Sequence, residues 1–119
     1  MGKFQELKVW QRSKDLSVYL YKITDHGTFS KDYGLRDQIR RAAVSISSNI
    51  AEGDELDTNR QAIKFFYTAK GSSAEVLTQA IIALEIGYID KDIFKYIEKE
   101  CQSVASMLSR LIQARNQKS

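Results

Sequence analysis

The chain has 119 residues, which suits one domain, and its 43% hydrophobic and 28% charged residues exclude an intrinsically disordered protein. The formal net charge of +3 allows contact with nucleic acid without requiring it. The single cysteine excludes an internal disulfide, and no apolar run reaches the ~18 residues of a membrane span, so we expect a cytoplasmic protein that inserts in no membrane.

Proline is absent from the chain, and this absence permits long uninterrupted helices. The first helix is predicted over residues 7–24. Its apolar side chains recur at steps of three, four and seven residues: Val9, Leu16, Leu20 and Ile23. Residues 25–34, DHGTFSKDYG, hold two glycines and several turn-forming residues, and they predict the one substantial loop.

The second helix is predicted over residues 35–52. Its apolar side chains form one stripe: Leu35, Ile39, Ala42, Ala43, Ile46 and Ile50. Gly53 follows directly, at the position where a glycine commonly caps the C-terminus of a helix. Residues 54–57 then predict a short acidic turn.

The third helix is predicted over residues 59–87, with Asp57 or Thr58 as its N-cap and Gly87 at its end. One apolar stripe contains Ile63, Phe66, Leu77, Ile81 and Leu84. Further apolar residues widen this stripe: Phe65, Ala69, Val76, Ala80 and Ala83. The helix is therefore apolar over more of its circumference than one packing face needs.

Ile82 and Ile86 fall near the opposite side of the third helix, and Val44 lies off the core stripe of the second. Single exposed apolar side chains are common in monomers. The apolar excess of the third helix nevertheless favours an oligomer interface that contains these three residues.

The fourth helix is predicted over residues 91–117, with Asp90 as its N-cap. Its apolar seam contains Ile93, Ile97, Val104, Leu108 and Leu111. Four helices with short connections predict an all-α, antiparallel up-down-up-down four-helix bundle that forms a single domain over residues 1–119.

No catalytic constellation emerges from the titratable residues. A di-metal bundle site needs Glu-x-x-His on two helices, whereas the one histidine, His26, lies in the predicted loop. Cys101 lies beside the apolar seam of the fourth helix and is expected to be a buried hydrophobe without a base. We therefore predict no enzyme activity, no metal site and no cofactor.

Basic side chains are segregated from acidic ones along the chain, and ten of them are candidate contacts for phosphates. These candidates are Lys8, Arg12, Lys14, Arg36, Arg40, Arg41, Arg60, Lys64, Arg110 and Arg115. The alternative interpretation is ordinary solvation of helix surfaces and matching of helix dipoles.

Asn49 and Glu52 lie near the end of the second helix, where a negative charge is unfavourable. Glu52 is therefore expected to have a partner, either at the start of the third helix or on a neighbouring subunit. Asn49 is expected to be partly buried and hydrogen-bonded.

Residues 34–53, GLRDQIRRAAVSISSNIAEG, resemble the signature of the four-helix-bundle proteins encoded in intervening sequences of bacterial 23S ribosomal RNA. Residues 7–10, LKVW, and residues 71–79, GSSAEVLTQ, extend the resemblance. Relatives often carry proline where this chain has Ser30 and Ser47. The family includes accessory variability proteins of diversity-generating retroelements.

The resemblance implies a protomer that assembles into a ring-shaped homopentamer with a basic surface and no enzymatic activity. The retroelement relatives bind a reverse transcriptase and nucleic acid. Beyond arginines 40 and 41, the motif carries over onto six residues without saying which of them touch a ligand, and we predict structural or inter-subunit roles for them: Gln38, Asn49, Glu52, Gly53, Glu75 and Gln79. We therefore expect a non-enzymatic oligomeric module that binds RNA or a ribonucleoprotein. The alternative is a protein–protein scaffold, or an accessory subunit for a partner such as a reverse transcriptase.

Overall fold

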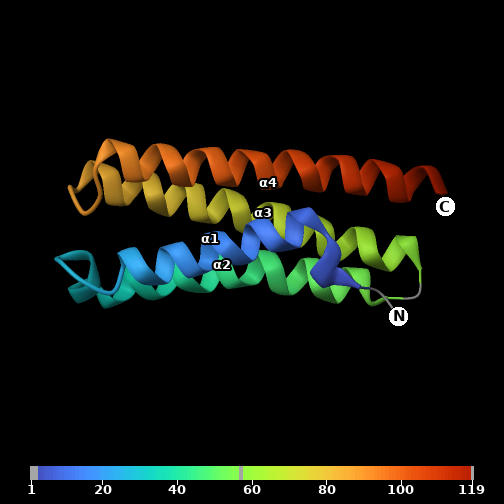
Figure 1. Ribbon diagram of the computed structural model, residues 1–119, viewed down its shortest axis with the longest axis horizontal. Helices are drawn as coiled ribbons and strands as arrows, with labels where there is room; N and C mark the ends of the chain where they lie inside the picture. Colours follow the sequence, from blue (N-terminus) through green and yellow to red (C-terminus); the bar gives the residue numbers. More distant parts are fainter. Residues whose placement is uncertain (1–2, 57, 119) are drawn as a thin grey trace.

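The computed structural model describes residues 3–56 and 58–118 and contains four α-helices that lie side by side along an axis of 47 Å (Figure 1). The helices are α1 (Lys8–Ile23), α2 (Tyr33–Asp54), α3 (Asn59–Glu85) and α4 (Lys91–Lys118). Two 3-10 helices, η1 (Phe4–Glu6) and η2 (Phe29–Lys31), precede α1 and α2. The described residues contain no strand, and none of their helices is long and apolar enough to cross a membrane.

One apolar core lies between the four helices and confirms the predicted all-α four-helix bundle. Each helix packs against its neighbour in the chain, and α1 also packs against α4. Large side chains from all four helices are fully buried in this core: Leu16, Leu20, Ile39, Ile46, Ile50, Phe66, Val76, Ile97, Val104 and Leu108. Burial of this apolar surface is the main favourable term in folding.

The start of α2 is fixed by Asp32, and the helix consequently begins two residues before the predicted position. The backbone N–H of Leu35 donates to Oδ1 of Asp32 over 3.1 Å, which is an N-cap hydrogen bond. The hydroxyl of Tyr88 donates to the other carboxylate oxygen over 2.9 Å. Asp32 therefore also ties the α3–α4 turn to the start of α2.

The predicted C-terminal cap at Gly53 is wrong, because this glycine lies inside α2 and is buried. A Cβ atom at Gly53 would lie 2.8 Å from Cε1 of Phe66 and 3.1 Å from the backbone oxygen of Ala62, both in α3. The missing side chain thus allows α2 and α3 to approach closely. The helix ends one residue later, and Glu55 is its C-cap.

The ends of α3 follow the predicted capping residues. The side chain of Thr58 accepts from the N–H of Gln61 at the start, whereas Asp57, the other predicted cap, lies outside the described residues. At the end, Gly87 has φ of +86° and follows the C-cap Ile86. The N–H groups of Gly87 and Tyr88 donate back to the carbonyls of residues 84 and 83, which is the Schellman arrangement.

The buried face of α3 is rotated relative to the predicted stripe. Its fully buried side chains include Phe66, Val76 and the alanines at 62, 69, 80 and 83. Ile81 was predicted to face the core, but it is 40% exposed. The reason is that small side chains, which carry little weight in an apolar periodicity, form the contact surface with α2.

Candidate functional site

Arg12 holds α1 against α4 and is not available as a free cation. Its Nε donates to Oε1 of Glu100 over 2.8 Å, and its Nη2 donates to Oε2 over 3.1 Å. Glu100 is buried, so this bidentate pair compensates a carboxylate that would otherwise lack water. The same interaction raises the pKa of Arg12.

Two arginines of α2 bind the segment that precedes them. Nε of Arg40 donates to Oγ1 of Thr24 over 2.8 Å, and its guanidinium lies 4.5 Å from the ring centre of Tyr21. Arg36 donates to the backbone oxygen of Ser30 over 3.0 Å and also pairs with the adjacent residue 37. These contacts fix the connection between α1 and α2.

Arg115 links helices at the other end of the molecule. Its guanidinium donates to Oδ1 of Asp54 over 3.1 Å and to Oδ1 of Asn59 over 3.3 Å. It also lies 5.4 Å from the ring centre of Phe66. The last residue of α2, the first residue of α3 and the end of α4 are therefore joined by one side chain.

The other predicted basic candidates lie on the surface. Lys14 pairs with Asp15, and Arg110 donates to Oγ of Ser106. Four exposed residues make no side-chain hydrogen bond or ion pair with any other described residue: Lys8, Arg41, Arg60 and Lys64. The structure thus divides the candidates into four arginines that connect helices and six residues that face solvent.

A basic groove of about 420 Å³ lies between α1 and α4, and we call it the α1–α4 groove. Its lining consists of Arg12, Lys99, Gln102, Ser103, Ser106, Met107 and Arg110. Lys8 and Arg110 line an adjoining hollow of about 300 Å³. Cationic groups and hydroxyl donors therefore gather on one surface, which is the donor chemistry that binds phosphate oxygens.

Lys99 was missed by the sequence-based search, although a signal for it exists. Lys99, Ser103, Ser106 and Arg110 follow one another at steps of four, three and four residues, which places them on one face of α4. The neighbouring acids at 98 and 100 concealed this face. The contribution of Arg12 depends on the packing of α1 against α4, which helical periodicity does not show.

The motif residues from the family resemblance gather along the seam between α2 and α3. The hydroxyls of Ser45 and Ser72 share a hydrogen bond of 2.8 Å across this seam. Nδ2 of Asn49 donates to the carbonyl and the hydroxyl of Ser45, as expected for a partly buried amide. Nε2 of Gln79 makes a long contact of 3.4 Å with Oε1 of Gln38.

The two acidic motif residues are exposed. Glu52 was expected to have a partner, but within the described part of its own chain it makes no ion pair or hydrogen bond. Glu75 lines a hollow of about 230 Å³ together with Gln79, and it is equally unpaired among the described residues. The predicted contact of Glu52 with a neighbouring subunit stays a prediction.

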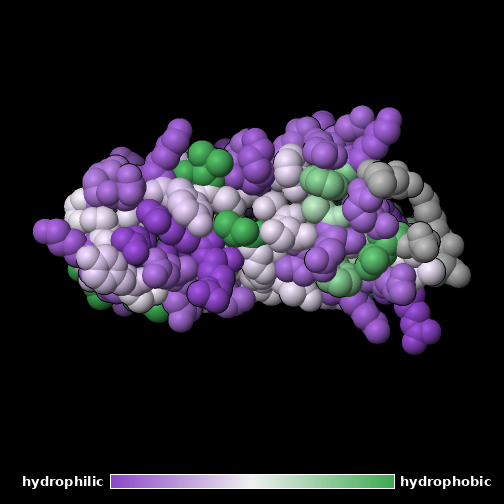
Figure 2. All heavy atoms as spheres, turned by 90° about the horizontal axis from the view of Figure 1, so that it is seen from below, coloured by the Kyte–Doolittle hydropathy of each residue, from purple (hydrophilic) through white to green (hydrophobic). Residues whose placement is uncertain are grey.

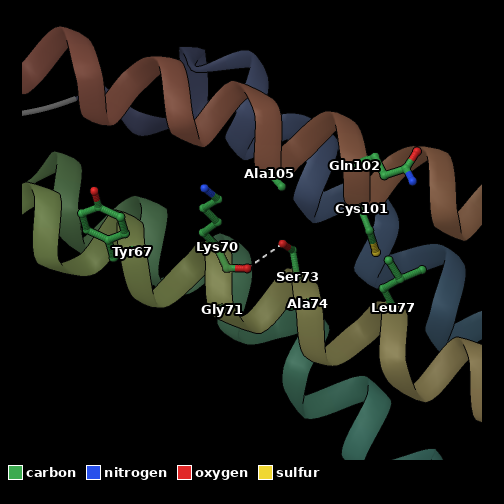
Figure 3. A pocket seen from close by; sticks show the side chains of 9 residues that line it. All are labelled: Tyr67, Lys70, Gly71, Ser73, Ala74, Leu77, Cys101, Gln102 and Ala105. Carbon is green, nitrogen blue, oxygen red and sulfur yellow. Dashed lines mark hydrogen bonds between the residues drawn. The ribbon is translucent and has the colours of Figure 1, made fainter.

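An apolar groove of about 460 Å³ lies on the surface between α3 and α4, and we call it the α3–α4 groove (Figure 3). Its lining consists of Tyr67, Lys70, Gly71, Ser73, Ala74, Leu77, Cys101, Gln102 and Ala105. The predicted interface residues lie outside it and are exposed: Val44 by 40%, Ile82 by 45% and Ile86 by 53%. By contrast, the face that α1 and α2 present in Figure 2 is mostly hydrophilic.

Cys101 lies at this groove but is a poor nucleophile. It is 2% exposed, and burial together with the charge of Glu100 raises the pKa of its thiol to about 12. His26, the one histidine, is exposed in the α1–α2 loop. Among residues 3–56 and 58–118, no group of three histidine, cysteine or acidic side chains is arranged to hold a metal ion.

Residues 5–110 match the sequence model of the family described as 23S rRNA-intervening sequence protein. A similar solved structure is that of a protein with unknown function from the S23 ribosomal protein family of Bacteroides thetaiotaomicron VPI-5482. The two are 20% identical, with a TM-score of 0.80 over 87% of this chain and 97% of that chain, so the likeness shows the fold alone. No curated protein matches the sequence.

Proposed function

This chain belongs to the 23S rRNA-intervening sequence protein family, and we propose that it is a non-enzymatic, oligomeric module that binds RNA through the α1–α4 groove. The observation that carries the proposal is the convergence of Lys99 and Arg110 with two serine hydroxyls around one groove. Lys8 lines the adjoining hollow and extends this surface. Such side chains contact phosphates without reading the base sequence.

Glu100 neutralises Arg12, so the free positive charge of the groove comes from Lys99, Arg110 and Lys8. Two or three phosphate contacts per protomer give weak binding at physiological salt. Oligomerisation multiplies these contacts and raises the effective affinity without any new interaction. The proposed oligomer and the proposed RNA binding therefore support each other.

The test is a titration of structured RNA across a salt series, with Lys99→Ala/Arg110→Ala as the variant. Loss of two phosphate contacts makes the negative slope of log K against log salt shallower by about 1.4 to 1.8 per protomer. The matched control is Lys22→Ala/Lys31→Ala, which removes the same charge from exposed positions near the α1–α2 loop. Equal slopes for the two variants, or no binding at low salt, would contradict the proposal.

For the protomer we propose an antiparallel up-down-up-down order, and for the assembly a pentameric ring. The order is supported by the contact of Tyr88, after α3, with Asp32, before α2, and by the contact of Arg115 with Asp54 at the other end. The ring size is supported by the family resemblance of residues 34–53. Sedimentation equilibrium measures the mass of the assembly directly.

A second candidate function is an accessory subunit that binds a protein partner such as a reverse transcriptase. The exposed isoleucines 82 and 86 of α3 favour this alternative, because a contiguous apolar surface marks a protein contact. Complex formation with a purified partner that persists after nuclease treatment and in high salt would favour it over RNA binding.

A further inference from the structure

Two apolar surfaces of α3 have no partner among the described residues of the chain. The first is the α3–α4 groove, whose walls carry apolar and small side chains (Figure 3). The second is an exposed knob on the last turns of α3, formed by Ile82 and Ile86, which lie one helical turn apart. The groove lies along the middle of α3, so the two surfaces are separate.

Gly71 at the edge of the groove is not required by the fold of the chain itself. A Cβ atom at this position would meet no atom within 4 Å, and the φ angle is not positive. Glycine in a helix interior is less stable than alanine by about 0.5–1 kcal/mol. Close approach of another molecule gives this glycine a role, as Gly53 has within the chain.

The charges beside the two surfaces are complementary. Lys70 is half-buried at the groove, and its ammonium group makes no hydrogen bond or ion pair with any other described residue. Figure 3 shows the Lys70 and Tyr67 side chains toward the same end of the groove. Glu85 lies on the helix between Ile82 and Ile86, is exposed and is likewise unpaired within the described chain.

We propose that Ile82 and Ile86 of one copy insert into the α3–α4 groove of a second copy, with Glu85 of the first copy facing Lys70 of the second. The inference rests on the oligomer of the proposed function and names the surfaces that build it. Because the knob and the groove are different surfaces, the contact is head-to-tail, and repetition of such a contact forms a ring when the rotation between copies closes. Each copy then contributes one knob and one groove.

Two variants block one surface each. Ile82→Asp/Ile86→Asp places carboxylates on the knob, and Ala74→Arg fills the groove from an exposed helical position where a long side chain leaves the core intact. Val18→Asp is the control, because Val18 on α1 is 46% exposed and Ile82 is 45% exposed. Circular dichroism and the urea midpoint verify that each variant folds.

Sedimentation equilibrium then gives the result. Wild type and Val18→Asp should be oligomers, each blocked variant alone should be a monomer, and an equal mixture of the two should form a dimer. The dimer is expected because one intact knob and one intact groove remain. A wild-type oligomer that survives both variants, or a mixture that stays monomeric, overturns this inference while the proposed RNA binding stands. A monomeric wild type refutes the proposed oligomer itself.

Discussion

The same substitution at two helical glycines should change stability in opposite directions. Gly53 and Gly71 both lie within helices, and alanine has the higher helix propensity at either position. At Gly71 the added methyl group meets nothing within 4 Å, so only the propensity gain remains. At Gly53 the methyl group meets the ring of Phe66 and the backbone of Ala62.

The magnitudes follow from these contacts. Gly71→Ala should raise the free energy of unfolding of the monomer by about 0.5–1 kcal/mol. At Gly53 the clash distances of 2.8 and 3.1 Å involve a buried ring and a backbone oxygen, neither of which can move freely. Overpacking of this kind costs about 1–3 kcal/mol, and the propensity gain near the end of α2 offsets only part of it. A net loss of about 0.5–2 kcal/mol remains for Gly53→Ala.

Urea unfolding followed by circular dichroism measures both effects, at a protein concentration low enough that the chain is monomeric. In thermal scans, 1 kcal/mol corresponds to a shift in Tm of about 4 °C for a domain of this size. The reasoning is refuted if Gly53→Ala is as stable as the wild type, or if Gly71→Ala is less stable. The first result would mean that α2 and α3 separate without cost, and the second that Gly71 has a contact within its own chain.

Three further predictions concern single side chains. Glu100→Gln should lower the free energy of unfolding by about 1–3 kcal/mol, because it breaks the bidentate pair with the partly exposed Arg12. Asp15→Asn should lower it by less than about 1 kcal/mol, because the pair of Asp15 with Lys14 is exposed. The hydrogen bonds to Asp32 lower the pKa of its carboxyl group. The ionised carboxylate therefore stabilises the fold above the ordinary carboxyl range, and this contribution is lost as the pH falls through the lowered pKa. Asp32→Asn should accordingly flatten the acid limb of a stability–pH curve below about pH 4. Cys101, with a pKa of about 12 and 2% exposure, should resist alkylation by iodoacetamide at pH 8 until the chain unfolds. Mass spectrometry follows the alkylation, and a rate equal to that of a free peptide thiol would contradict this prediction.

Apolar periodicity predicted the fold because each helix of a bundle buries one face, and this regularity is visible in the sequence. Family membership was likewise predicted from residues 34–53 and is confirmed by the match over residues 5–110. The errors at Gly53 and Ile81 have one cause. The contact between α2 and α3 includes small residues such as Gly53 and Ala62, and a scale that rewards large apolar side chains displaces the centre of the predicted buried face of α3.

The candidate site was less predictable because charge along a sequence does not reveal pairing in space. Arg12 and Glu100 are 88 positions apart, and Arg115 and Asp54 are 61 apart. Such long-range pairs convert predicted phosphate contacts into links between helices. Lys99 was overlooked for the same reason: its neighbour Glu100 is paired with Arg12 across the bundle, and Lys99 lines the groove beside this pair.

The two proposed surfaces meet on α4, and this position determines how they can be tested separately. Gln102 lines both the α1–α4 groove and the α3–α4 groove, so these two hollows adjoin each other on α4. A second copy seated between α3 and α4 would therefore lie beside the basic groove of the first, and RNA could follow from one copy to the next. Substitutions on the groove side of α4 would then disturb both interactions. The knob residues Ile82 and Ile86 line neither groove, so changing them removes self-association while every basic side chain of the α1–α4 groove stays in place.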